Sequence, residues 1–230
     1  MDVRRKTSTE LVMLRSNYTI YCFWTEDNPM SETRLRCLQQ LREVSQCNVV
    51  LVTAHTLPSY ILPEHPLHEG YRYLSAVHKS DYLRCYFMHF HGGGYADIKL
   101  TMGSWVKAFR DMEINPTAYI NGYQAGGPDN VSNPDLKQHW HVLTGVGQFI
   151  IRPRTEFTTE WYQALQSIMD AQLESLRRNP AQDPYDCSTS GTGYPIGYTD
   201  LLGIPFNRVQ YKYRHRTMYT CPKHYFSHYR

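Results

Sequence analysis

YTIYCFW at positions 18–24 and NVVLVT at positions 48–53 are apolar runs with the composition of strands, and a helical pattern lies between them. β-Branched and aromatic residues fill the first run, and the second is continuously apolar, as in a strand buried on both faces. Apolar residues recur at helical spacing over 31–45, behind Ser31 as a candidate N-cap. Together these segments predict a β-α-β unit.

Helical and strand patterns alternate along the rest of the chain. A helical pattern over 71–90 ends at His91-Gly92-Gly93-Gly94, where glycine can adopt the left-handed conformation that terminates a helix. An amphipathic pattern over 157–176 predicts a second long helix. We expect a short helix at 104–110, strands at 95–100, 118–123, 148–152 and 209–213, and loops at 126–134 and over most of 179–230. This alternation predicts an α/β fold, a mostly parallel sheet flanked by helices, with ligands at the carboxyl ends of its strands.

The composition is that of an ordinary globular chain. Its 230 residues, 41% of them hydrophobic and 20% charged, suffice for one core and are too few for two, so we expect a single domain over 1–230. Six cysteines without a CxxC pair favour buried thiols over disulfides or a zinc site. Without an apolar stretch long enough to cross a bilayer, and with an N-terminus that turns polar too early for a signal peptide, we expect a cytoplasmic protein with no transmembrane segment.

The net charge of the chain indicates which class of ligand it binds. A net charge of +3 is too small for an obligate nucleic-acid-binding protein but suits a protein that binds an anionic small molecule. The tail 207–230 interleaves basic and aromatic residues and has no acidic residue, a composition that could serve RNA. A solvated tail explains the same pattern, and we expect no nucleic-acid partner.

The densest group of chemically active residues lies in SDYLR at 80–84 and HGGGYADIK at 91–99. Asp81 and Arg84 are three residues apart on an expected helix, and Asp97 and Lys99 two apart on an expected strand, so each pair shares a face. Both pairs could converge on one crevice. The alternatives are a surface ion pair for the first and a solvated strand face for the second.

These residues resemble the S-D-x-x-R … G-G-x-Y-x-D-x-D signature of nucleotide-sugar glycosyltransferases with the GT-A fold, a Rossmann-like α/β fold. That group includes capsular-polysaccharide-synthesis glycosyltransferases, Och1-like mannosyltransferases and the glucosyltransferase domains of large clostridial toxins. YCFWT near the start and YPI, LLG and YKY near the end are also similar to the capsular type, so the resemblance covers roughly 18–213. It implies transfer of a hexose or pentose from a nucleotide diphosphate sugar, with a uridine-linked donor favoured, to a glycan or glycoconjugate, as in polysaccharide biosynthesis.

The resemblance also implies roles for individual residues. Trp24 matches a tryptophan that stacks on uracil, although a core tryptophan at a strand end is the alternative. Asp81 and Arg84 match residues that bind the hydroxyls of the donor sugar. Tyr95 is the tyrosine of the motif and is assigned to substrate binding with them. Asp97 matches the first aspartate of D-x-D, which touches the ribose, the sugar and the metal shell.

The chain departs from the D-x-D pattern at Lys99, where relatives have the aspartate that binds the metal directly. Relatives neutralise the diphosphate leaving group with a divalent cation, and an ammonium on the same face could replace part of that charge. We therefore assign Lys99 a catalytic and substrate-binding role and expect no cofactor to be required. Mn²⁺ or Mg²⁺ held by Asp97 with His224 or His228 is the alternative, and loss of catalysis is another.

Asp200 is the candidate acid/base or acceptor-binding residue, because relatives have an acidic residue at a similar place. An acid near a helix N-terminus is the other interpretation of Asp200. The HxH pairs His89/His91 and His139/His141 lack a third ligand at metal-site spacing and are assigned to loops or helix ends. We therefore predict a GT-A glycosyltransferase with Asp97, Lys99 and Asp200 as catalytic residues. A catalytically inactive nucleotide-sugar-binding or interaction protein is the competing class.

Overall fold

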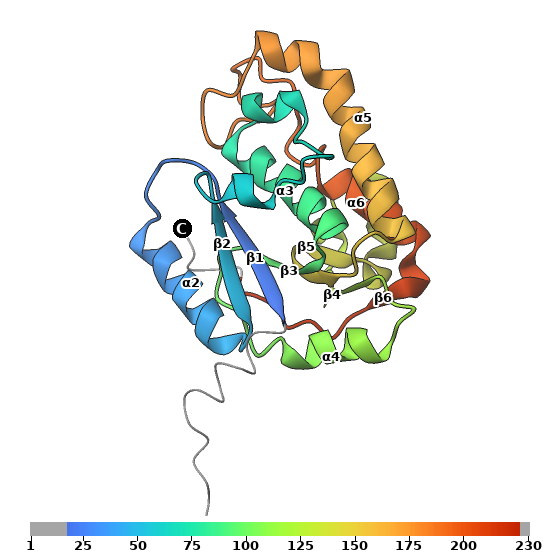
Figure 1. Ribbon diagram of the computed structural model, residues 1–230. Helices are drawn as coiled ribbons and strands as arrows, with labels where there is room; N and C mark the ends of the chain where they lie inside the picture. The colour runs from blue at the N-terminus through green and yellow to red at the C-terminus, as the bar shows by residue number, and fades with distance from the viewer. Residues whose placement is uncertain (1–17, 226–230) are drawn as a thin grey trace, which may run out of the picture.

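The β-α-β unit predicted from the first apolar runs is present at one edge of the sheet. The structure is a computed structural model that describes residues 18–225 (Figure 1). Strand β1 (Thr19–Trp24) pairs in parallel with β2 (Asn48–Thr53), from Thr19 opposite Asn48 to Trp24 opposite Thr53. Helix α2 (Glu32–Val44) connects them, and the Ser31 side chain caps it by accepting the Arg34 N–H.

Within residues 18–225 the strands form one six-stranded sheet in the order β2-β1-β3-β5-β4-β6. Strand β3 (Gly93–Ala96) is parallel to β1, and β6 (Thr217–Met218) is parallel to β4 (Ile120–Gln124). Strand β5 (Thr144–Ile151) runs antiparallel between β3 and β4. The predicted class, an α/β fold with a mostly parallel sheet flanked by helices, is confirmed.

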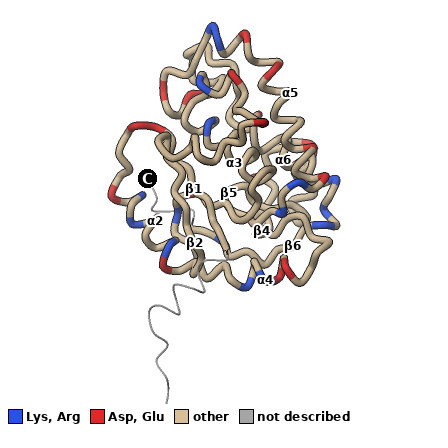
Figure 2. The backbone as a smooth tube through the Cα atoms, in the orientation of Figure 1, with Lys and Arg blue, Asp and Glu red and all other residues tan. Residues whose placement is uncertain are grey.

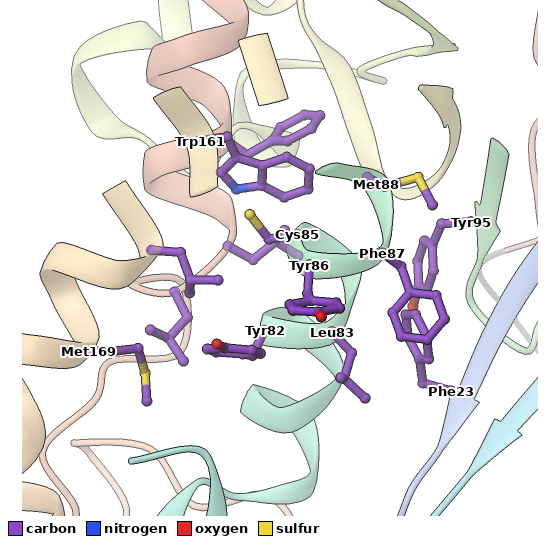
Figure 3. Packing of buried hydrophobic residues seen from close by; sticks show 14 of the residues in the cluster. Phe23, Tyr82, Leu83, Cys85, Tyr86, Phe87, Met88, Tyr95, Trp161 and Met169 are labelled. Carbon is purple, nitrogen blue, oxygen red and sulfur yellow. The ribbon is translucent and has the colours of Figure 1, made fainter. Parts of the chain in front are cut away.

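Helices cover both faces of the sheet because its strands are apolar on both sides. On one face, α3 (Ala76–Phe90), α5 (Glu156–Arg178) and α6 (Gly203–Lys212) pack in one core that includes Phe23, Tyr95 and Trp161 (Figure 3). On the other face, α2 and α4 (Val106–Ile114) cover Ile20 and Cys22. Most of the large, fully buried aromatic side chains therefore lie on the α3 face of the sheet, while Trp105 lies on the other face.

Short 3-10 helices occupy the connections, at Leu57–Tyr60, Glu69–Tyr73, Pro128–Asn130, Pro134–Val142 and Arg214–Arg216. All six cysteines are free thiols, five of them buried as predicted, while Cys187 is only half-buried. No helix in the described part of the chain is long and apolar enough to cross a membrane.

Two predicted element boundaries around the motif are wrong. The helix predicted at 71–90 begins at Ala76, because the Ser75 side chain caps it and 69–73 forms a 3-10 helix instead. It ends where predicted, at His91, with Gly92 at φ +66°. The strand predicted at 95–100 is β3, Gly93–Ala96, so Asp97 and Lys99 lie just beyond the strand rather than on its face.

The C-terminal prediction is also wrong. Of the residues expected as a strand at 209–213, the first four belong to helix α6 and Tyr213 is its C-cap. Phe206 and Val209 of this helix are buried three residues apart in the core shared with α5. The aromatic and β-branched composition suggested a strand locally, but packing against α5 favours the helix. The other predicted helices and strands are present with shifted ends.

Candidate functional site

A cavity of about 530 Å³ opens at the carboxyl ends of β1 and β3, where ligands were expected. Its lining comes from the end of β1, one face of α3, the residues after β3 and the start of β5, segments far apart in the sequence. Trp24, Asp81, Arg84, Tyr95, Asp97 and Lys99 all line it. Every substrate-binding residue predicted from the sequence therefore lines the same cavity.

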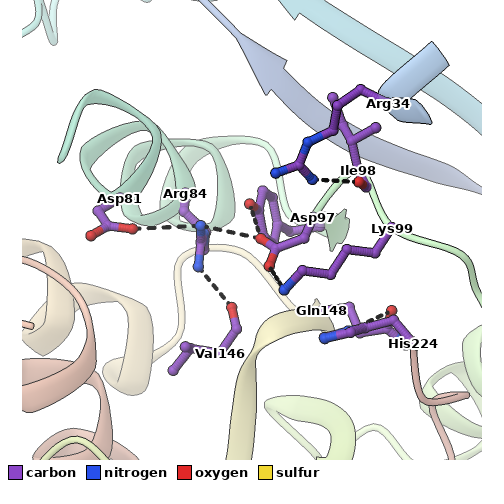
Figure 4. A network of polar contacts seen from close by, with 10 residues as sticks. Arg34, Asp81, Arg84, Asp97, Ile98, Lys99, Val146, Gln148 and His224 are labelled. Carbon is purple, nitrogen blue, oxygen red and sulfur yellow. Dashed lines mark hydrogen bonds and ion pairs between the residues drawn. The ribbon is translucent and has the colours of Figure 1, made fainter. Parts of the chain in front are cut away.

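Asp97 is the centre of the polar network in this cavity (Figure 4). Its Oδ1 accepts a hydrogen bond from the Tyr95 hydroxyl at 2.7 Å, and its Oδ2 accepts one from the Lys99 Nζ at 2.8 Å. Its backbone N–H donates to the Gly147 carbonyl at 2.7 Å, which holds it against β5. Burial alone would raise the pKa of Asp97, but the charges of Lys99 and Arg84 outweigh it and hold that pKa far below its usual range. Asp97 is therefore a fixed anion.

Arg84 joins the two carboxylates of the site and is itself buried. Its Nη2 lies 3.5 Å from both Asp81 Oδ1 and Asp97 Oδ1, and its Nη1 donates to the Val146 carbonyl at 2.8 Å. The guanidinium also lies over the Tyr95 ring, 4.1 Å from its centroid. Burial would lower the pKa of Arg84, but the anionic groups around it raise it. The interpretation of Asp81 and Arg84 as a surface ion pair is wrong, because both side chains are 8% exposed.

Asp81 differs from Asp97 although both face Arg84. Burial raises the pKa of Asp81 to about 7, with Arg84 opposing the rise and Asp97 adding to it. A carboxyl group with that pKa is partly protonated at neutral pH and can donate as well as accept hydrogen bonds. A ligand in the cavity therefore meets one permanent anion, Asp97, and one carboxyl group, Asp81, whose charge varies around neutral pH.

Trp24 ends β1 at the rim of the cavity. Its side chain is half-buried, and its indole N–H donates to the Asn28 carbonyl at 2.8 Å, which fixes the plane of the ring. The side chain packs against the core cluster beneath α2, so the alternative of a core tryptophan describes part of its surroundings. It also lines the cavity, where an indole ring can stack on a flat ligand.

Sequence reasoning missed Arg34 in this site. It lies in the first turn of α2 and lines the cavity, and its Nη1 donates to the Ile98 carbonyl at 2.7 Å. A basic residue soon after the first strand was the only local signal, and it is too common to be diagnostic.

His224, considered only as one of two alternative metal ligands, is buried in the cavity wall beside Asp97. An antiparallel bridge between Thr101 and His224 brings it there, and its Nδ1 lies 3.2 Å from Gln148 Oε1. Burial lowers the pKa of His224 to about 4, so the ring is neutral at physiological pH. His228, the second candidate, lies outside the described residues.

The donor set around Asp97 does not fit a divalent metal ion. Lys99 Nζ donates to one carboxylate oxygen and the Tyr95 hydroxyl to the other, so a metal ion bound to Asp97 would lie beside an ammonium group. In the part of the chain that the structure describes, no three His, Cys, Asp or Glu side chains converge as a metal site would need. An ammonium in direct contact with the carboxylate repels a dication placed beside it.

Asp200 is the predicted catalytic residue that the structure does not bring to the cavity. Its carboxylate is exposed and accepts the backbone N–H of Gly197 at 2.8 Å within a turn, and it is absent from the lining formed by the described residues. Asp200 lies three residues before Gly203, the first residue of helix α6, which agrees with its interpretation as an acid near a helix N-terminus. A direct catalytic role stays a prediction without geometric support.

The HxH pairs lie away from the cavity and contact unrelated partners. His89 Nδ1 lies 3.2 Å from the Thr158 hydroxyl, His91 Nε2 lies 2.8 Å from the Tyr60 carbonyl, and His139 Nε2 lies 3.2 Å from the Tyr211 hydroxyl. The basic and aromatic residues of the tail pair with one another: Arg214 lies over Tyr211, 4.7 Å from the ring centroid, and Lys212 over Tyr213 at 5.2 Å. Aromatic faces used within the chain in this way are less available for stacking on nucleic-acid bases.

No protein-family model matches the chain, and no curated protein sequence matches it either. Among solved structures, the chain is similar to the PaToxG glycosyltransferase with a TM-score of 0.48 and 9% sequence identity. The superposition covers 86% of this chain and 70% of that one.

Proposed function

We propose that this protein is a GT-A glycosyltransferase that transfers a sugar from a nucleotide diphosphate sugar, with a uridine diphosphate sugar favoured, to a hydroxyl of a glycan or glycoconjugate. The observation that carries the proposal is the convergence of Trp24, Asp81, Arg84, Asp97 and Lys99 on one cavity. These residues lie on β1, α3 and the loop after β3, and they match the motif positions that bind a donor in the family the sequence resembles. We propose one such domain over 1–230, and the free thiols agree with a reducing, cytoplasmic location.

In this proposal each cavity residue recognises one part of the donor. The Trp24 ring stacks on the base, since its indole N–H is held by the Asn28 carbonyl and its side chain lines the cavity. Asp97, a fixed anion, accepts hydrogen bonds from ribose and sugar hydroxyls. Asp81 binds a further sugar hydroxyl. Arg84 is buried between the two carboxylates and acts mainly by holding their oxygens in place.

Lys99 neutralises the diphosphate. The reaction breaks the bond between the anomeric carbon and the diphosphate oxygen and forms one to the acceptor oxygen, and the acceptor proton passes to a base or to solvent. Negative charge therefore develops on the departing diphosphate, and a cation placed beside it lowers the barrier. The ammonium of Lys99 supplies that charge without a divalent metal, and the Arg34 guanidinium lines the same cavity. We propose that metal dependence is weak or absent.

Nucleotide binding tests the proposal directly. The melting temperature is measured with UDP, GDP and their common sugars, each with Mn²⁺ and with chelator, for the wild type and for Trp24→Ala. We expect UDP and one UDP-sugar to stabilise the wild type, and Trp24→Ala to weaken that binding by about tenfold, the contribution of one stacked base. Trp140→Ala is the matched control, since Trp140 is half-buried but lies outside the cavity lining. If no nucleotide diphosphate raises the melting temperature of the wild type, the proposal is excluded.

The second candidate is a catalytically inactive nucleotide-sugar-binding protein, and the lysine in place of the second D-x-D aspartate favours it. Donor hydrolysis discriminates the two. The enzyme slowly releases nucleotide diphosphate from its own donor sugar in the absence of acceptor, and the inactive protein is stabilised by the donor without consuming it.

A further inference from the structure

We propose that Tyr185 and Tyr198 form an aromatic platform at the mouth of the cavity that binds an uncharged pyranose ring of the acceptor. The inference rests on the proposed function, because the platform borders the cavity assigned to the donor. It names the acceptor class as neutral carbohydrate and assigns a binding site to two residues to which the sequence motif gives no role.

The two tyrosines are unusual in being both exposed and part of the cavity lining. Tyr185 is 71% exposed and Tyr198 is 66% exposed. Among the exposed large hydrophobic side chains of residues 18–225, these two alone line the cavity. Apolar surface beside a functional cavity commonly marks a binding surface, and tyrosine offers a flat apolar face together with a polar hydroxyl.

Both tyrosines are held by contacts to the first turn of α3. The Pro184 carbonyl, just before Tyr185, accepts the Val77 N–H at 3.2 Å. The Gly197 carbonyl, just before Tyr198, lies 3.1 Å from His78 Nε2. Val77 and His78 are consecutive residues, so the backbone segments just before Tyr185 and Tyr198 contact neighbouring positions of the same helical turn.

Buried contacts fix these anchors. His78 is fully buried, its Nδ1 lies 3.0 Å from the Tyr194 hydroxyl, and the two rings stack with centroids 5.5 Å apart. Because a carbonyl can only accept, the proton of a neutral His78 is on Nε2, facing Gly197. The Asp200 carboxylate accepts the Gly197 N–H and stiffens the same turn. Rings on a fixed backbone lose little conformational entropy when a ligand binds, which favours a preformed binding surface.

The segment that carries the two tyrosines has no cation that would attract an anionic ligand. The residues that it contributes to the cavity lining are uncharged, and positions 179–207 contain Asp183, Asp186 and Asp200 and no lysine or arginine. Such a segment disfavours phosphorylated, carboxylated or nucleic-acid acceptors. Aromatic faces pack instead against the apolar C–H face of a pyranose ring, whose hydroxyls remain free for hydrogen bonds. A neutral sugar fits both the aromatic surface and the absence of cations on this segment.

One helix connects the platform to the donor residues. The first turn of α3 anchors both tyrosine segments, and the next turns carry Asp81 and Arg84. The acceptor surface and two donor-site residues, Asp81 and Arg84, are therefore positioned by the same rigid element. A sugar resting on the two rings lies beside the cavity in which the proposed transfer takes place.

Ligand-observed NMR and calorimetry with neutral disaccharides test the platform. The probes are maltose, cellobiose, lactose and N,N′-diacetylchitobiose, each added with and without UDP. We expect at least one to bind the wild type with a dissociation constant of roughly millimolar order, and Tyr185→Ala and Tyr198→Ala each to weaken it by about tenfold. Phenylalanine at either position keeps the ring and retains binding within about threefold. Tyr219→Ala, an exposed tyrosine outside the cavity lining, is the matched control and leaves disaccharide binding unchanged.

The preference for an uncharged acceptor is tested by comparing the binding of lactose with that of sialyllactose, which carries a carboxylate. We expect the carboxylated sugar to bind more weakly at low salt and the difference to shrink at high salt. Equal or tighter binding of sialyllactose at low salt would overturn the assignment of a neutral acceptor.

Failure of the platform is distinguishable from failure of the proposed function. If UDP stabilises the wild type but none of the four disaccharides binds, or the alanine variants bind them as tightly as the wild type, the platform is wrong and the donor site stands. If disaccharides bind in a tyrosine-dependent way but no nucleotide diphosphate does, the platform stands and the proposed function fails. The melting temperature of each variant identifies any loss of binding caused by unfolding.

Discussion

Replacing Lys99 by aspartate should make the site, which we propose to work without a metal ion, dependent on a divalent ion. In the wild type the Lys99 ammonium lies 2.8 Å from Asp97 Oδ2, with the two side chains 14% and 23% exposed. Lys99→Asp removes that cation and places a second carboxylate beside the first. It thereby restores the pair of acidic residues that D-x-D glycosyltransferases use to hold a divalent ion.

The size of the effect follows from the geometry. Two unit charges 2.8 Å apart interact by about 6 kcal/mol at an effective dielectric constant of about 20, before desolvation is subtracted. Removing one partner of a buried ion pair costs about 3–5 kcal/mol. The lower end applies here, because Arg84 and Tyr95 still contact Asp97. We expect Lys99→Asp without metal to lose at least about 3 kcal/mol of unfolding free energy, since the new carboxylate also repels Asp97, and Mn²⁺ at a hundred times its dissociation constant to restore about 2.7 kcal/mol.

The assay combines chemical denaturation with UDP titration, each in excess chelator and in Mn²⁺. Lys99→Met removes the charge without adding a metal ligand, so it should be destabilised and remain insensitive to Mn²⁺. Lys79→Met is the matched control, because Lys79 pairs with Glu26 at 2.9 Å but lies outside the cavity lining. For the wild type we expect chelation to change UDP affinity by less than about threefold, and for Lys99→Asp we expect Mn²⁺ to raise it by about tenfold.

Two results would refute this reasoning. Exhaustive chelation that lowers wild-type donor hydrolysis or transfer by about a hundredfold, with recovery in manganese or magnesium, would mean that a metal ion and not the ammonium neutralises the diphosphate. A Lys99→Asp variant that is as stable as the wild type in chelator, and indifferent to Mn²⁺, would mean that Lys99 does not balance the charge of Asp97.

Three further predictions concern other residues of the site. Arg84→Met should lower the unfolding free energy by about 3–5 kcal/mol and abolish donor binding as well, because two carboxylates and a carbonyl lose one buried partner; unchanged denaturation would contradict it. His224, whose pKa burial lowers from 6.5 to about 4, stays neutral in the folded chain but binds a proton when unfolded. Stability should therefore fall by up to about 3 kcal/mol as the pH drops from about 6.5 to about 4, and denaturation of His224→Gln across that range should give a flatter profile. Asp200→Asn keeps an oxygen that can accept the Gly197 N–H, so transfer should stay within about threefold of wild type; a loss of about a hundredfold would restore Asp200 as the acid/base.

Local patterns in the sequence determined the first β-α-β unit and the placement of the motif residues. The strand at 18–24, the Ser31 cap and the continuous apolar run at 48–53 are short-range signals, and tertiary packing reinforces them. Gly92 ended the long helix as predicted, because its φ of +66° is one that few other residues adopt. The convergence of Asp81 and Arg84 on Asp97 followed from helix spacing and from the strand that begins directly after the helix.

Only the tertiary structure decided which side chains complete the site. Arg34 and His224 reach the cavity from opposite ends of the chain, and no spacing rule relates residues so far apart in sequence. Helix α6 formed where composition suggested a strand, because burial of Phe206 and Val209 against α5 outweighs weak local preferences. Asp200 turned toward the Gly197 N–H, while Tyr198 came to the cavity mouth because buried His78 holds the segment before it. Long-range packing and buried hydrogen bonds set these positions, and they exist only once the chain has folded.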